Sequence, residues 1–171
     1  PKLTVNPNGG TWSGSTSSQN FYEVSGTTKS IANPTAGPTY TISYNANSQG
    51  ATYTGSPTSV QRPFSSWTKG GTGTWNSSTK VWTFGNGDGT LTASYSATSN
   101  TFTLPVISKT NYVCGWRIGS SSGTYYASGA TNVTITGNTT FYASCHDNAF
   151  YRISNMQQMT SAICATATTP A

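Results

Sequence analysis

Charged residues are scarce in this chain of 171 residues, because Asp, Glu, Lys and Arg together make up only 6% of it. Soluble domains usually carry about 25%. Most hydrolytic mechanisms need a carboxylate pair, a nucleophile with a base, or a metal held by three or four ligands. Nothing in the spacing of the acids and the lone histidine suggests such a set: they are Glu23, Asp88, His146 and Asp147. We therefore expect no enzyme activity, no metal site and no cofactor.

Basic residues exceed acidic ones and give a net charge of +5, but they are scattered singly along the sequence. Nucleic-acid-binding proteins gather Lys and Arg into a patch or stripe. The simpler interpretation is a mildly basic surface with a weak attraction to anionic cell-surface polymers, and we expect no nucleic-acid partner.

Long apolar runs are absent as well. No run approaches the roughly 20 residues that span a bilayer, so the sequence predicts no insertion into a membrane. The first residues lack the basic and apolar regions of a signal peptide, and we expect the chain to begin inside a longer protein.

Cysteine is limited to Cys114, Cys145 and Cys164, and none of them forms a CxxC pair. With a single histidine, this pattern gives little support to a metal site. One disulfide with one remaining thiol is typical of an exported protein whose third cysteine pairs outside this stretch.

Hydroxyl groups and aromatic rings take the place of charges. Five tryptophans and 33% hydrophobic residues argue against disorder. β-Branched and aromatic residues alternate between turns of Gly, Asn and Pro, which is typical of strands. We predict strands at residues 3–5, 40–44, 90–95, 101–104, 112–118, 132–135 and 140–145, and a hairpin over 75–84.

The apolar pattern changes near residue 147. Between residues 148 and 165 the apolar residues follow one another at steps of three and four, which is typical of one face of an amphipathic helix. The fold class predicted for the chain is therefore mainly β with a short C-terminal α-helix, within a separate segment at 147–171.

Two parts of the chain repeat the same features in the same order. The openings at residues 3–10 and 40–47 each combine a strand with an Asn-x-Asn turn. Later, Trp67 and Trp116 each follow a proline and an aromatic residue, and closing strands with Ala93-Ser94 and Ala143-Ser144 come next. This order of features predicts an internal repeat.

These features resemble the Listeria–Bacteroides repeat, also called the internalin B-repeat family of bacterial cell-wall proteins. The likeness covers roughly residues 3 to 146 and is closest from 105 to 146, although Ser48-Gln49-Gly50 departs from the Gly-Gly of the family's opening. The segment from Met156 to Cys164 is similar to the start of a Fibrobacter-type paralogous domain. The matching residues are Asn6, Asn8, Gly9, Gly10, Asn45, Asn47, Tyr112, Gly115, Trp116, Phe141, Tyr142 and Ala143.

The resemblance implies one or two small β-grasp-like repeat modules, a first elongated module at 1–98 and a second at 99–146. It implies a secreted or wall-anchored bacterial protein, extracellular at the cell surface or in the cell wall, in which the module is a non-catalytic stalk and adhesive surface. The implied partners are neighbouring repeats of the same chain and a protein or glycan on a host or neighbouring cell.

The repeat would also place the strands of Cys114 and Cys145 side by side, at positions where family members have apolar residues. We favour a disulfide between these two over one between Cys145 and Cys164. Closing a loop of about 30 residues would contribute on the order of 3 kcal/mol to stability.

Trp67 and Trp116 occupy repeat positions that mark core anchors. Trp12, Trp75 and Trp82 instead lie in hairpin or turn contexts, where they could be exposed and bind a ligand. Two alternative functions therefore stay open. One is a carbohydrate-binding module that uses exposed Trp and Tyr, and the other is a module that binds a host receptor or immunoglobulin through an apolar patch or a free sheet edge.

Overall fold

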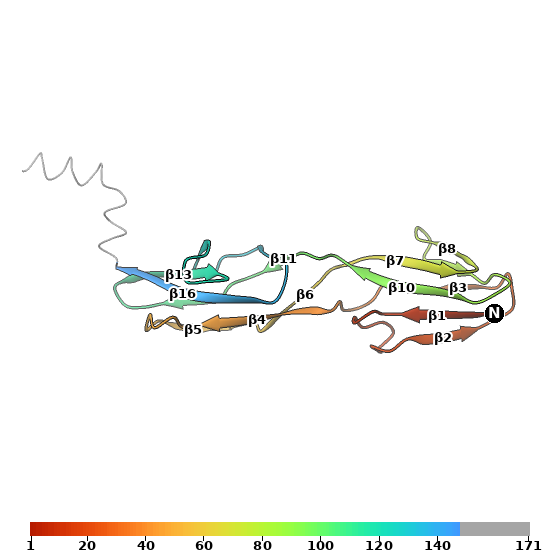
Figure 1. Cartoon of the computed structure of the whole chain (residues 1–171), viewed down its shortest axis with the longest axis horizontal. Helices are drawn as coiled ribbons and strands as arrows, with labels where there is room; N and C mark the ends of the chain where they lie inside the picture. The colour runs from red at the N-terminus through yellow and green to blue at the C-terminus, as the bar shows by residue number, and fades with distance from the viewer. Residues whose placement is uncertain (148–171) are drawn as a thin grey trace, which may run out of the picture. The chain divides into compact units, whose positions relative to one another are not determined.

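The computed structural model describes residues 1–147, and all regular secondary structure in that part of the chain is β-strand (Figure 1). This confirms the prediction of a mainly β fold, while the predicted C-terminal helix lies outside the described residues. The described part contains no helix that could cross a membrane. Its strands are β1 (Lys2–Asn6), β2 (Gln19–Tyr22), β3 (Thr28–Ser30), β4 (Thr39–Asn45), β5 (Thr52–Thr54), β6 (Ser59–Gln61), β7 (Phe64–Gly71), β8 (Thr74–Asn76), β9 (Val81–Thr83), β10 (Gly89–Tyr95), β11 (Ser99–Phe102), β12 (Val106–Ser108), β13 (Tyr112–Ile118), β14 (Tyr125–Ala127), β15 (Val133–Ile135) and β16 (Thr139–Asp147).

The strands belong to two compact units, and each unit combines separate stretches of the chain. The first unit contains residues 1–41, 59–100 and 134–137, and the second contains 42–58, 101–133 and, within the described residues, 138–147. This arrangement differs from the contiguous division into 1–98 and 99–146 that the sequence suggests. The difference arises because residues 42–58 carry strand segments of the second unit but precede the closing strands of the first.

The first unit contains a four-stranded sheet in the order β2-β1-β10-β7. β1 runs parallel to β10, and β7 runs antiparallel to β10. Alternate residues of β1 and β10 point into the core, where Leu3, Val5, Leu91 and Ala93 are fully buried. A second sheet, in the order β3-β9-β8, adds Trp82 to the same core.

The second unit is built around neighbouring strands in the order β14-β13-β16-β4, to which β4 contributes residues 42–45. A small two-stranded sheet of this unit joins β12 to β5. Trp116 is completely buried, and its indole Nε1 donates a hydrogen bond to the carbonyl of Pro105 at 2.9 Å. Beside it, Tyr44 donates its hydroxyl to the carbonyl of Pro57 at 2.7 Å, and burial together with the nearby Tyr53 raises the pKa of Tyr44 to about 12.

The internal repeat predicted from the sequence is present as a repeated strand arrangement. In the first unit β1 is parallel to β10, which pairs antiparallel with β7. In the second unit β4 is parallel to β16, which pairs antiparallel with β13. Trp67 lies opposite Ala93 in the first pair of strands, and Trp116 lies opposite Ala143 in the second. The same pair of side chains therefore occupies equivalent register positions in both units.

Each opening strand also ends in the same hydrogen-bonded turn. The Nδ2 amide of Asn8 donates to the carbonyl of Ala93 at 2.9 Å, and that of Asn47 donates to Ala143 at 3.1 Å. Both asparagines have positive φ, 49° for Asn8 and 51° for Asn47, a conformation that Asn tolerates better than most residues. The Asn-x-Asn signal thus marks the point where each opening strand is tied to its closing strand.

We expect Asn47→Ala to lower the free energy of unfolding by about 1–2 kcal/mol, because it removes the bond to Ala143 and forces alanine into a positive φ. Asn47→Gly removes the same bond but accepts the backbone conformation, so its loss should be smaller. Urea denaturation followed by tryptophan fluorescence measures both. Equal stability of wild type and Asn47→Ala would contradict this account of the turn.

A disulfide joins Cys114 to Cys145, with a Cα–Cα distance of 4.1 Å across β13 and β16, which confirms the favoured pairing. The two cysteines lie directly opposite each other; Cys145 is two residues after Ala143, and Cys114 is two residues before Trp116. At the matching place in the first unit, Phe64 lies opposite Tyr95 and their rings are 6.0 Å apart. One unit thus uses a packed aromatic pair where the other uses a covalent bond.

Candidate functional site

A β-bulge shapes one face of the first unit. Residues an odd number of positions apart normally point to opposite faces of a strand. In β7, however, the register against β10 shifts between Ser94 and Tyr95, which leaves Ser65 as an extra residue and changes the alternation. Phe64 and Trp67 consequently share a face, and their ring centroids are 5.6 Å apart.

These two rings begin a continuous row, which we call the aromatic row and define as Phe64, Trp67, Trp12 and Phe21. Trp67 contacts Trp12 edge to face at 6.3 Å, and Trp12 contacts Phe21 in the same way at 6.0 Å. The two tryptophans in the middle are buried, with 8% and 6% of their surface exposed. The two phenylalanines are half-buried, so each of them keeps part of its ring surface open.

Two hollows lie along the aromatic row. Hollow A has a volume of about 410 Å³, and hollow B has a volume of about 360 Å³. Asn33 lines both, so the hollows adjoin. The residues that line hollow A include Phe64, Trp67, Trp75, Ser77, Lys80 and Asn33. The residues that line hollow B include Trp12, Gln19, Phe21, Lys29, Asn33 and Thr35.

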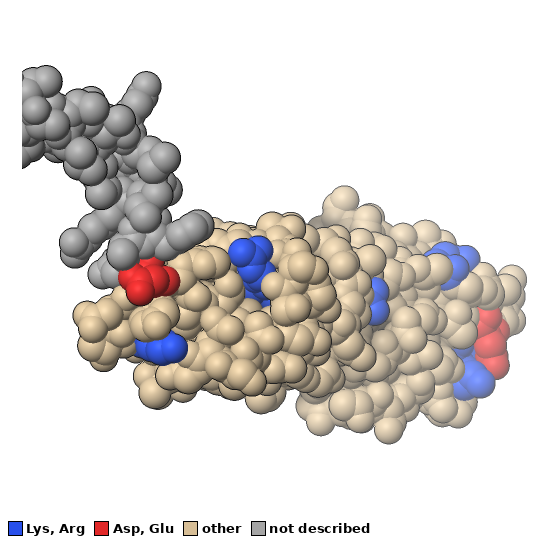
Figure 2. All heavy atoms as spheres, turned by 60° about the vertical axis from the view of Figure 1, so that its left-hand side comes forward, with Lys and Arg blue, Asp and Glu red and all other residues tan. Residues whose placement is uncertain are grey.

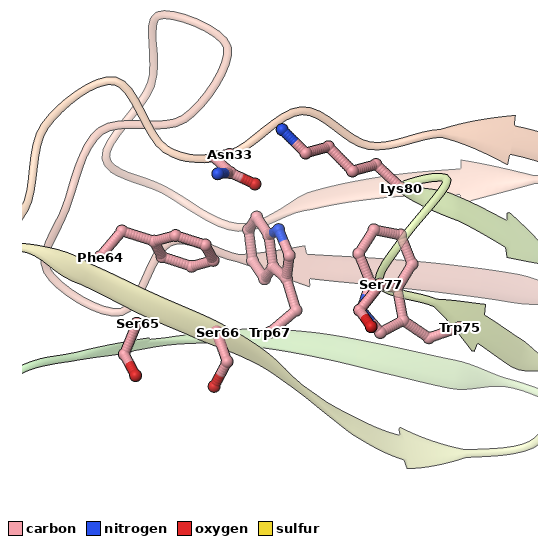
Figure 3. A pocket seen from close by; sticks show the side chains of 8 residues that line it. All are labelled: Asn33, Phe64, Ser65, Ser66, Trp67, Trp75, Ser77 and Lys80. Atoms are coloured by element: carbon pink, nitrogen blue, oxygen red, sulfur yellow. The ribbon is translucent and has the colours of Figure 1, made fainter.

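The close view of hollow A shows how its side chains are arranged (Figure 3). The indole of Trp67 stands between Phe64 and Trp75, and Asn33 and Lys80 lie on one side of these rings. Trp75 comes from β8 and Lys80 from the turn before β9, so the β8–β9 hairpin forms one end of the hollow. The result is an aromatic surface with amide, hydroxyl and ammonium groups at its border.

The two indole groups of the row differ in their hydrogen bonding. Nε1 of Trp12 donates to the carbonyl of Ala32 at 2.8 Å. Nε1 of Trp67 is buried and has no acceptor among the described residues. Buried polar groups are nearly always paired. The Nε1 of Trp67, a residue that lines hollow A, is therefore an unsatisfied hydrogen-bond donor.

The hollows carry positive and no negative charge. Nζ of Lys29 lies 4.1 Å from the ring centroid of Phe21, and Lys80 is exposed. Neither hollow is lined by a carboxylate. Away from the hollows, an ion pair joins Lys2 to Asp88 at 3.5 Å. The pKa of Asp88 is lowered mainly because its carboxylate accepts the backbone N–H of Lys2.

Figure 2 shows charged side chains on one face of the molecule as separate spots and not as a patch. This agrees with their single placement in the sequence. Within residues 1–147 there is also no group of three or more His, Cys, Asp or Glu side chains that could hold a metal ion.

The three tryptophans proposed as ligand-binding residues have different positions. Trp75 is half-buried and lines hollow A. The expectation that Trp12 and Trp82 are exposed is wrong, since 6% and 1% of their surfaces are accessible. Trp12 nevertheless lines hollow B. Trp82 lines neither hollow, because its ring packs closely on the backbone around Gly73 and Gly89, where a Cβ would approach it within 2.5 and 2.3 Å.

Sequence reasoning missed most of the lining residues. Phe21, Lys29, Asn33 and Lys80 belong to no sequence motif, and Phe64 stands out in the sequence only as the aromatic residue that precedes Trp67 in the repeat. The cation and aromatic residues of this face come from five separate segments of the first unit: the loop before β2, β2, β3, β7 and the β8–β9 hairpin. Only their convergence in the fold makes them a candidate site.

Comparison with protein-family models, curated proteins and solved structures found no match. The functional argument therefore depends on the residues of this chain. The alternative of a host-protein-binding module concerns a different place in the first unit. There the outer strand β2 and the residues after it expose Tyr22 and Val24, with 71% and 73% of their surfaces accessible.

Proposed function

We propose that this chain is a non-catalytic repeat module of a secreted or wall-anchored bacterial surface protein, where it acts as a stalk and adhesive surface. The observation that carries the proposal is the repeated strand arrangement. Both units tie an opening strand to a parallel closing strand through an Asn amide, at 2.9 and 3.1 Å, and both place a Trp opposite an Ala in the same register. Surface proteins commonly gain length and binding area by repeating one unit.

Further observations support the same proposal. The disulfide between Cys114 and Cys145 suits an oxidising environment outside the cell. Each unit pairs its opening strand in parallel with its closing strand, and on this basis we propose a β-grasp-like module of the Listeria–Bacteroides repeat type. The partners proposed are neighbouring repeats and a protein or glycan on a host or neighbouring cell.

Labelling of intact cells tests the proposed location. An antibody raised against the purified chain should label intact cells of the bacterium that produces it, and brief treatment of those cells with an external protease should remove the label. Labelling that appears only after the cells are permeabilised would contradict the proposal.

Adhesion is tested separately with beads that carry the folded chain. These beads should attach to host epithelial cells or to neighbouring bacteria more strongly than beads that carry the same chain after reduction and heat denaturation. Equal attachment of the two kinds of bead would show that the folded module has no adhesive surface.

A further inference from the structure

We infer that hollows A and B together bind a linear polysaccharide whose sugar units carry carboxylate groups. The inference rests on the proposed adhesive function and names its ligand. Four features of the first unit carry it: the aromatic row, the two lysines, the unpaired indole donor and the polar border.

The aromatic surface fits sugar rings. Ligand sites combine apolar and aromatic walls with a few placed polar groups. Phe64 and Trp75 are half-buried, so each presents part of a ring on which the apolar C–H face of a sugar can lie. The ring of Phe21 is covered on one face by the ammonium group of Lys29. The buried Trp12 and Trp67 pack between the two phenylalanines at 5.6 to 6.3 Å and keep these surfaces in place before a ligand binds.

The cations indicate a ligand with separated negative charges. Lys29 borders hollow B and Lys80 borders hollow A, and no carboxylate lies in either hollow to neutralise them. A single small anion would use one of them. A chain that occupies both adjoining hollows can bring one carboxylate to each lysine, and this accounts for the continuity of the hollows through Asn33.

The polar border matches hydroxyl groups. Asn33 stands where the two hollows meet and offers both a donor and acceptors. Ser77 in hollow A and Gln19 and Thr35 in hollow B add further polar groups. Groups of this kind can both donate to and accept from the hydroxyls of a sugar.

The unpaired N–H of Trp67 gives the site an unused donor. Less than 1 Å² of this nitrogen is accessible, so a ligand oxygen in hollow A reaches it only when the side chains that cover it move. Trp82 also has a buried Nε1 without an acceptor, but it lines neither hollow. The indole donor therefore counts only together with the hollow beside it.

Single-stranded nucleic acid is the other polymer that stacks on aromatic side chains. Its binding sites add a positively charged groove that follows every phosphate. Here two cations lie among amides and hydroxyls, which favours a ligand rich in hydroxyls with occasional charges.

The test uses a hyaluronan oligosaccharide, in which every second sugar carries a carboxylate, and titrates it into the full chain while tryptophan fluorescence and heat are recorded. Matched ligands are the same oligosaccharide with its carboxyl groups reduced to alcohols, neutral dextran, and a single-stranded oligodeoxynucleotide. We expect the carboxylated sugar to bind tighter than its reduced form by about tenfold, with an affinity that falls as salt is added.

Variants locate the binding. Lys80→Gln and Lys29→Gln should each weaken binding by about threefold, whereas Lys69→Gln should leave it unchanged. Lys69 is the matched control, because it lies on β7 like Trp67, loses the same charge and lines neither hollow. Trp75→Ala should weaken binding by about tenfold, and Tyr22→Ala, which removes an exposed ring outside both hollows, should not.

Each variant is compared with wild type by urea denaturation, so that lost binding is separated from lost folding. The inference is overturned if the carboxylated and reduced sugars bind equally, if Lys69→Gln acts like Lys80→Gln, if the oligonucleotide binds tighter than the sugar, or if no sugar binds. Beads carrying Lys80→Gln or Trp75→Ala that attach to cells as wild type does would overturn this inference and leave the proposed adhesive function standing. Labelling that appears only in permeabilised cells would contradict the proposed function and leave a measured sugar affinity intact.

Discussion

Replacing Trp116 with alanine is expected to lower the free energy of unfolding by about 3–5 kcal/mol. The side chain is completely buried, its ring lies 4.9 Å from Tyr53 and 5.3 Å from Tyr44, and its Nε1 donates to Pro105 at 2.9 Å. The substitution opens a large cavity and leaves the carbonyl of Pro105 without this donor. Urea denaturation measures the loss as a lower midpoint.

Two further variants separate the contributions to this effect. Trp116→Phe keeps much of the ring but removes the hydrogen bond, so its loss should lie between wild type and Trp116→Ala. Trp75→Ala removes an indole that is only half-buried and should cost clearly less. If Trp116→Ala and Trp75→Ala shift the midpoint equally, Trp116 does not anchor the core of the second unit.

Removal of the disulfide with the double variant Cys114→Val/Cys145→Val should lower the free energy of unfolding by about 3 kcal/mol. The bond closes a loop between residues 31 positions apart, and its loss gives the unfolded chain more conformations. Valine keeps an apolar, β-branched side chain at both strand positions, so the variant mainly removes the covalent constraint.

A reducing agent provides the control for this variant. It should lower the stability of wild type to about that of the double variant and should leave the double variant unchanged. A double variant as stable as the oxidised wild type would show that the packing of β13 on β16 is sufficient by itself.

Much of the strand pattern could be predicted from the sequence. Alternation of apolar and polar residues predicts strands such as β10, because alternate residues of this strand are buried. The repeated Asn, Trp and Ala positions located equivalent strands in the two units. The same alignment also predicts that the strands of Cys114 and Cys145 lie side by side, whereas the spacing of the cysteines alone does not predict which two are paired.

Other features depend on interactions that leave little trace in sequence. Three-residue strands such as β3 and β12 are too short for a period to be recognised. The bulge at Ser65 reverses which side chains share a face, so the pairing of Phe64 with Trp67 could not be read from alternation. The two hollows form beside this bulge, between segments that are far apart in the sequence. Their positions could therefore not be predicted from local sequence patterns.

The alternation of segments between the two units has a consequence for a protein exposed to proteases. The chain passes from one unit to the other after residues 41, 58, 100, 133 and 137. A single cut between residues 42 and 133 therefore leaves each unit with segments on both fragments. The packing and hydrogen bonds of the sheets, and for cuts between 114 and 145 the disulfide as well, still connect the pieces. A nicked molecule can thus keep both units folded, including the face that carries hollows A and B. A protein of two units joined by one linker would instead be divided into separate units by one cut in that linker.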